Sequence, residues 1–219
     1  MTILEAIRAR HSVRAYKDIP IEEELRDQMD AFAAQANEES GLNIQIVYDD
    51  PTGFDARLAH YGKFSNVSNY IVLKGAPSQD FEERCGYYGE MLVLEAQRLG
   101  LNTCWVAMTF NKKVVKKLVP KGEKLCMVIA LGYGENEGQP RTSKLMKDVL
   151  ATQGAMPGWF ADGVNAALLA PTATNQQKFK IGMVDGEPAI RVSGVGFCTK
   201  TDLGIVKYHF EVASGRKVK

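Results

Sequence analysis

The chain has 219 residues with 27 basic and 26 acidic side chains, a formal net charge of +1 and 45% hydrophobic residues. This composition is typical of a globular protein with an ample core. Its near-neutral charge leaves no electrostatic footprint for nucleic acid or an anionic membrane surface. The apolar runs are too short to span a bilayer, and the N-terminus has no signal-peptide pattern. Four cysteines without a CxxC pair favour reduced thiols, so we expect a cytoplasmic protein.

The first two predicted elements are helices. Thr2 and Glu5 have the spacing of a capping box, which predicts a short helix that ends near residues 8–10. Pro20 is suited to open a second helix over residues 21–37, where apolar side chains recur on one face.

Strand patterns follow. Residues 43–48 alternate and are rich in β-formers, residues 49–53 form a turn rich in Asp, Pro and Gly, and residues 69–74 predict a second strand. The strongest helical pattern covers residues 78–99 and closes at Gly100, a natural residue beyond a helix C-terminus.

The middle of the chain contains the most apolar strand. Residues 101–107 predict a buried turn and a short extended piece, and Asn111 is suited to cap a helix that runs through Leu118. Residues 124–131 are almost continuously apolar, which predicts a central strand of a sheet. Residues 132–140 contain three glycines and one proline, which predicts a loop.

The C-terminal part predicts two helices and a hairpin. One helix covers residues 157–169 and is ended by Pro171. Residues 178–184 and 189–192 predict a β-hairpin, and residues 202–213 a final helix. Helices and strands do not alternate strictly, so the order favours an α+β fold over a doubly wound α/β fold.

Several well-known motifs are absent. Gly132 and Gly134 follow a strand, but the next glycine is Gly138 and Pro140 follows, so no dinucleotide-binding fingerprint results. There is no phosphate loop, nucleophile elbow or HExxH motif. The three histidines, His11, His60 and His209, lack metal-ligand spacing, so we expect no metal site.

An anion site is suggested by Arg10, Ser12 and Arg14. In an extended stretch, alternate side chains point the same way, so two guanidiniums and a hydroxyl could converge on a phosphate monoester. The alternative is a basic helix end, where the cations interact favourably with the negative end of the helix dipole.

Two further polar stretches have open interpretations. Thr172, Asn175 and Gln177 follow a proline-stopped helix and are either a site for a planar polar heterocycle or a connection that satisfies helical carbonyls. Arg141 and Lys144 follow the glycine-rich loop and could add phosphate donors, although a surface loop is the simpler interpretation.

Together these segments resemble the nitroreductase-like family of FMN-dependent oxidoreductases. Residues 10–14 resemble its Arg-x-Ser-x-Arg/Lys motif, and residues 88–106 its central helix and the following turn. Residues 128–134, with Arg141, resemble its late strand and phosphate-contacting tail. Residues 170–177 resemble its Ala-Pro-Ser-x-x-Asn-x-Gln-Pro segment. The implied fold is α+β, a central, mostly antiparallel sheet flanked by helices.

Two departures from the family pattern affect the expected architecture. The 170–177 segment comes late instead of early, and Lys178 replaces the usual proline. This order resembles a compact branch called putative TM nitroreductases, in which one chain supplies both halves of what is a dimer in other members of the family. The resemblance therefore implies one domain over residues 1–219, with pseudo-symmetric halves that meet near 132–156. Both a monomer with a pseudo-dimeric site and a homodimer remain open.

The resemblance also implies roles for individual residues. Arg10 and Ser12 would hold the FMN phosphate with help from Arg141 and Lys144, and Arg14 would lie by the pyrimidine edge of the flavin. Asn175 would bond the polar edge, and backbone groups of residues 105–108 would approach flavin N5. The expected cofactor-binding residues are Arg10, His11, Ser12, Arg14, Trp105, Val106, Ala107, Met108, Arg141, Lys144, Thr172, Asn175 and Gln177.

The implied activity is that of an FMN-dependent NAD(P)H oxidoreductase. Hydride would pass through flavin N5 to a small electron acceptor, such as a nitroaromatic or a quinone, by a ping-pong route. No catalytic side chain is needed, because the flavin carries the chemistry. The alternatives are flavin cleavage or reductive dehalogenation on the same site, or a non-enzymatic flavin-binding protein. The sequence leaves open the physiological acceptor and the choice between NADH and NADPH.

Overall fold

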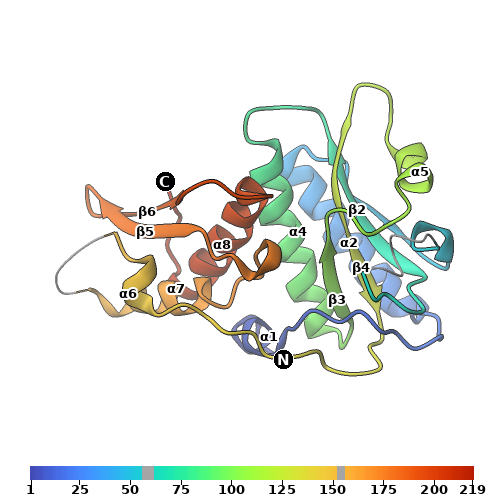
Figure 1. Cartoon of the computed structure of the whole chain (residues 1–219), viewed down its shortest axis with the longest axis horizontal. Helices are drawn as coiled ribbons and strands as arrows, with labels where there is room; N and C mark the ends of the chain where they lie inside the picture. The colour runs from blue at the N-terminus through green and yellow to red at the C-terminus, as the bar shows by residue number, and fades with distance from the viewer. Residues whose placement is uncertain (56–61, 152–155) are drawn as a thin grey trace.

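The computed structural model describes residues 1–55, 62–151 and 156–219 (Figure 1). His60 and part of the predicted boundary at 132–156 lie outside these residues. The helices are α1 (Ile3–Ala9), α2 (Glu23–Ser40), α4 (Phe81–Arg98), α5 (Lys112–Val115), α6 (Met146–Val149), α7 (Gly158–Ala167) and α8 (Thr199–Ser214). The strands are β1 (Gln45–Val47), β2 (Asn69–Gly75), β3 (Asn102–Val106), β4 (Lys124–Gly132), β5 (Phe179–Val184) and β6 (Glu187–Val192).

The main sheet has four strands in the order β1-β2-β4-β3, and all its neighbouring strands are antiparallel. The apolar strand β4 lies between β2 and β3, as the sequence predicts. Side chains alternate between the two faces because the strand period is two residues. Ile71 and Ile129 pack with α2 and α4, whereas Val72 and Val128 pack with irregular segments and α5 on the other face.

Helix α4 joins the sheet to a second layer. In Figure 1 it lies between the sheet and α8, and the β5-β6 hairpin and α7 lie beyond α8. The hairpin, α7 and α8 share a core that includes Phe160, Ile181 and Phe210. Two glycines permit the close approach of α4 and α8: a Cβ at Gly86 would collide with the carbonyl oxygen of Thr201, and one at Gly204 with that of Glu83.

The predicted α+β class and the nitroreductase-like architecture are confirmed. The differences lie at element ends and in two short elements. The helix predicted through Leu118 is shorter, because α5 gives way to a 3₁₀ turn at Lys116–Leu118. Helix α6 and a 3₁₀ turn at Ala173–Asn175 were not predicted, since neither is long enough to show a period. Within the described residues, no helix is both long and apolar enough to cross a membrane.

Candidate active site

Two adjoining cavities lie where three parts of the chain meet. These parts are the N-terminal segment (residues 10–15), the main sheet and the late segment (residues 170–177). The inner cavity has a volume of about 130 Å³ and the outer cavity about 510 Å³. Both are lined by Ser12, Arg14, Pro171, Thr172 and Thr174. A single chain therefore brings segments near residues 12 and 172 to one site, although they are far apart in sequence.

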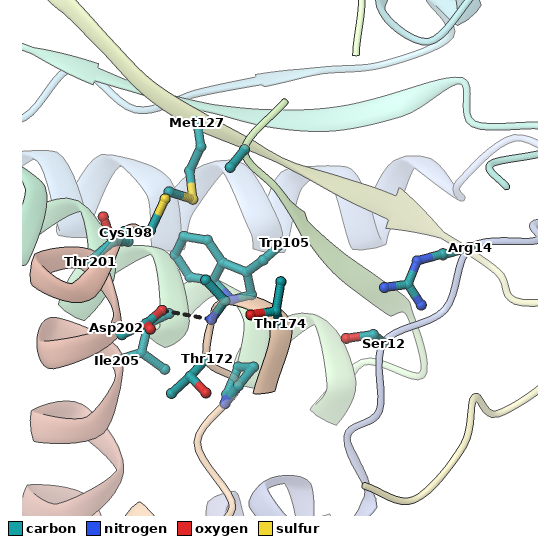
Figure 2. Close-up of a pocket in the computed structure, with 13 residues that line it drawn as sticks. Ser12, Arg14, Trp105, Met127, Thr172, Thr174, Cys198, Thr201, Asp202 and Ile205 are labelled. Carbon is teal, nitrogen blue, oxygen red and sulfur yellow. Dashed lines mark hydrogen bonds between the residues drawn. The ribbon is translucent and has the colours of Figure 1, made fainter. Parts of the chain in front are cut away.

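The inner cavity is built from β3, β4, the late segment and the start of α8. Figure 2 shows Trp105, Met127, Asp202 and Ile205 gathered around it, with Ser12 approaching from the opposite side. The remaining inner-cavity residues are Ala107, Ala173, Cys198 and Thr201. The remaining outer-cavity residues are Ala15, Lys63, Asn136, Gly138, Gln139, Arg141 and Asn175.

The N-terminal segment is fixed by the sheet edge and by a glycine loop. The amide of Val13 donates to the carbonyl of Thr103 at 3.0 Å, which continues the sheet beyond β3. Gly138, at φ +77°, packs against the same segment, and a Cβ there would lie 2.7 Å from the Cβ of His11. Ser12 and the exposed Arg14 thus face the cavities from a well-defined backbone.

Arg10 does not line either cavity but lies buried beside it. Its side chain is 1% exposed, and its Nε lies 3.9 Å from Glu90 Oε1. Among the described residues, its Nε and Nη2 have no hydrogen-bond partner, and neither does Nε of Arg141. Burial, with the like charge of Arg10, lowers the pKa of Arg141 to about 10. Two guanidiniums are therefore held close together with unused donors.

A buried network links Arg10 to the cavity wall. Glu90 accepts from the indole of Trp105 through Oε2 and contacts His209 Nε2 through Oε1, both at 2.8 Å. His209 Nδ1 lies 3.0 Å from the carbonyl of Ala166, which can only accept, so this nitrogen carries a proton. The contact between His209 and Glu90 then holds one further proton, on either partner.

The charge of this network follows from that proton. Either Arg10 and His209 are cations and Glu90 is an anion, or Arg10 is the one cation and the other two groups are neutral. Both states have a net charge of +1, and Arg141 adds a second positive charge nearby. Buried charge of one sign is costly unless it is compensated.

The late segment has an unusual backbone. Three of its non-glycine residues, Thr174, Asn175 and Gln177, have φ values of 49°, 55° and 46°, in the left-handed region. Such conformations cost free energy, persist only where the surroundings hold them, and cluster at functional sites. The segment is held on one side by the carbonyl of Thr142, which accepts from Asn175 Nδ2 at 2.8 Å.

On its other side the segment is held by Asp202 of α8. Asp202 Oδ1 accepts from the Ala173 amide at 2.9 Å, and Oδ2 accepts from Gln176 Nε2 at 2.7 Å. Burial raises the pKa of Asp202 to about 6, against the opposite effect of these two bonds. The inner cavity thus contains an acidic group that titrates near neutrality.

The thirteen sequence-predicted residues divide into two sets. Seven line the cavities: Ser12, Arg14, Trp105, Ala107, Arg141, Thr172 and Asn175. The other six do not line the cavities but lie within three positions of a lining residue in the sequence; they are Arg10, His11, Val106, Met108, Lys144 and Gln177. Gln177 is buried and Lys144 Nζ donates to its carbonyl at 2.8 Å, so these two side chains stabilise the late segment.

In the inner cavity, sequence reasoning missed Met127, Cys198, Thr201, Asp202 and Ile205. Met127 is part of an apolar strand and Ile205 of an apolar helix face, so both match ordinary core positions. Asp202 near a helix start matches an acid that complements the helix dipole. Within residues 1–55, 62–151 and 156–219, no group of three or more His, Cys, Asp or Glu could hold a metal ion.

Comparisons with known proteins agree with this architecture. The family model described as "Putative TM nitroreductase" matches residues 2–214. A putative nitroreductase from Thermotoga maritima MSB8 is 23% identical, with a TM-score of 0.70 over 97% of this chain and 83% of that one. A putative NADH dehydrogenase/NAD(P)H nitroreductase from Parabacteroides distasonis is 25% identical, with a TM-score of 0.53 over 67% of this chain and 95% of that one.

An FMN-dependent nitroreductase from Clostridium difficile R20291 is 20% identical, with a TM-score of 0.52 over 64% of this chain and 91% of that one. No curated protein matches the sequence. Because the family model covers nearly the whole chain, this protein belongs to the putative TM nitroreductase family.

Proposed function

We propose that the protein is an FMN-dependent oxidoreductase that uses NAD(P)H to reduce a small organic acceptor. The observation that carries the proposal is the buried positive charge beside the cavities, with unused donors on Arg10 and Arg141. Membership of a nitroreductase family supports the reaction class. The likeness to a protein named NADH dehydrogenase/NAD(P)H nitroreductase supports the choice of a nicotinamide as reductant.

The donor set fits a phosphate monoester. Each buried N–H that lacks a partner costs about 1–3 kcal/mol, and a phosphate would offer several acceptor oxygens and nearly two negative charges. Guanidiniums bind such oxygens through charge-assisted bonds. Arg141 lines the outer cavity and Arg10 lies behind it, so we place the phosphate of FMN there, with Ser12 as a further donor.

Lys144 has a lesser part in this proposal. Its Nζ donates to the carbonyl of Gln177, so it would have to give up that bond to reach a phosphate. Arg14, which lines both cavities, is suited to the pyrimidine edge of the flavin, and Asn175 to its polar groups. The strand end at residues 105–108 would lie against the ring system, with the indole of Trp105 held in place by Glu90.

The division of labour follows from these contacts. FMN, when bound, would supply the redox chemistry by taking hydride from NAD(P)H and passing it to the acceptor. The chain would bind the phosphate, place a cation at the pyrimidine edge and exclude water from the inner cavity. A cation in that position favours a ligand that gains negative charge on reduction.

The decisive experiment is an absorbance spectrum of the purified protein before and after incubation with FMN, followed by anaerobic mixing with NADH and with NADPH. We expect flavin bands that bleach rapidly with one or both nucleotides. A protein that stays colourless after incubation with FMN would refute the proposal. Flavin that binds but is reduced by dithionite alone would instead indicate a non-enzymatic flavin-binding protein.

A further inference from the structure

Asp202 is the charged group that connects α8 to the late segment. Its two carboxylate oxygens accept from the Ala173 amide and from Gln176 Nε2. The same Gln176 Nε2 donates to the carbonyl of Phe197 at 2.7 Å, in the loop that leads into α8. Asp202 as a whole residue is 7% exposed, so its bonds are largely shielded from water.

The segment that Asp202 holds has a conformation that needs support. Between the two residues it contacts lie Thr174 and Asn175, both in the left-handed region. Left-handed conformations cost about 1–2 kcal/mol per non-glycine residue, so the segment requires restraints at both ends. Asp202 provides one of these restraints, beside the bonds that Thr142 and Lys144 make to the segment.

The two left-handed residues of the segment also line the cavities. Thr174 lines the inner and outer cavities, and Asn175 lines the outer one. We propose that Asp202 is a positioning residue, which holds residues 172–177 in the shape that binds the flavin. The part of this inference that concerns flavin binding rests on the proposed function. The part that concerns the restraint of residues 172–177 does not.

The test is a comparison of Asp202→Asn with the wild type. The carboxamide has one acceptor oxygen, so its NH₂ group must face either the Ala173 amide or Gln176 Nε2, and one bond is lost in either orientation. The matched control is Asp162→Asn, which makes the same change at an exposed carboxylate of α7. Circular dichroism establishes that both variants fold.

The first measurement needs no cofactor. Hydrogen exchange of the peptide that spans residues 172–177 should be at least about tenfold faster in Asp202→Asn than in the wild type or the control, because an amide that loses its partner opens more readily. Gln176→Ala removes the second bond from the other side and should show the same faster exchange. Unchanged exchange in both variants would overturn the inference.

The second measurement is FMN affinity, followed by quenching of flavin fluorescence. At pH 7.5 we expect Asp202→Asn to weaken FMN about tenfold, which corresponds to about 1.4 kcal/mol. The control should bind FMN as the wild type does. Equal affinities for Asp202→Asn and wild type would overturn the inference even if both proteins bind FMN well, and a wild type that binds no FMN would refute the proposed function instead.

A pH series separates positioning by the charge from a merely structural role. A protonated Asp202 has one acceptor fewer, so the ratio of the two FMN dissociation constants should shrink toward unity as the pH falls from 7.5 to 5. Taking the ratio cancels the titration of the FMN phosphate itself, whose second pKa is about 6. Of the other described residues that line the inner cavity, Arg14 and Cys198 carry ionisable groups, and burial raises the pKa of Cys198 to about 11, above this pH range. A ratio independent of pH would contradict positioning by the carboxylate.

Discussion

The indole N–H of Trp105 donates to Glu90 Oε2 at 2.8 Å, so a wall of the inner cavity is fixed by a carboxylate that is fully buried. The other oxygen of Glu90 contacts His209, and Arg10 lies beside it. The side chain that orients the wall therefore also lies against the guanidinium that we place behind the phosphate site. Any change at Glu90 acts on both parts of the site.

Replacing Glu90 separates its bonding role from its charge. Glu90→Gln keeps an acceptor for Trp105 and offers an NH₂ group to a neutral His209, so we expect it to cost less than about 1.5 kcal/mol of stability. Glu90→Ala removes both bonds and leaves Arg10 without its partner, which should cost about 3–5 kcal/mol. Urea denaturation measures both values. A Gln variant as unstable as the Ala variant would show that the negative charge itself is required.

Arg141 offers the cleaner test of the phosphate site. Arg10 belongs to the Glu90 network, so its removal would change stability and binding together. Arg141→Met should weaken FMN about 30-fold through loss of a charge-assisted contact worth about 2 kcal/mol, and riboflavin much less. The exposed Arg191 of β6 provides the control, as Arg191→Met should leave both affinities unchanged. Equal losses for FMN and riboflavin would place Arg141 away from the phosphate.

The titration of Asp202 predicts a specific pH dependence of stability. Its folded pKa of about 6 exceeds the ordinary aspartate value of 3.8 because burial disfavours the charge. The folded state therefore binds the proton more tightly, and Asp202 reduces stability as the pH rises through this window. The free energy of unfolding of Asp202→Asn relative to wild type should increase between about pH 4 and 6, by on the order of 3 kcal/mol, and then level off. A relative stability that stays constant with pH would contradict the raised pKa.

The sequence predicted those features that depend on local order. Helix α4 has a long apolar period and a closing glycine, and the predicted 78–99 agrees closely with Phe81–Arg98. The apolar run of β4 indicated its central place in the sheet. The spacing of apolar residues depends on which face of a helix or strand is buried, so such elements can be predicted from that spacing alone.

The site was less predictable because its contacts are long-range. Asp202 meets Ala173 and Gln176 across 26 or more residues, and no local spacing encodes that pairing. Its raised pKa results from burial, which no spacing of neighbouring residues shows. The unused donors of Arg10 could be recognised only in the structure, because the sequence left open whether this arginine binds an anion or belongs to a basic helix end.

The close contact of α4 and α8 sets the last prediction. An alanine in a helix is ordinarily more stable than a glycine by roughly 0.5–1 kcal/mol, but a Cβ at Gly204 would collide with the carbonyl of Glu83. Backbone cannot rotate aside as a side chain can, so the two helices must separate, and overpacking of this kind costs about 1–3 kcal/mol.

Gly158, at the start of α7, provides the control, because no described heavy atom approaches the place of its Cβ within 4 Å. Thermal or urea unfolding should show Gly204→Ala to be less stable than wild type by about 2 kcal/mol and Gly158→Ala to be equal or slightly more stable. Because α8 also carries Asp202, the separation should speed amide exchange at residues 172–177 as well; a Gly204→Ala protein as stable as the wild type would mean that the two helices pack less closely than described.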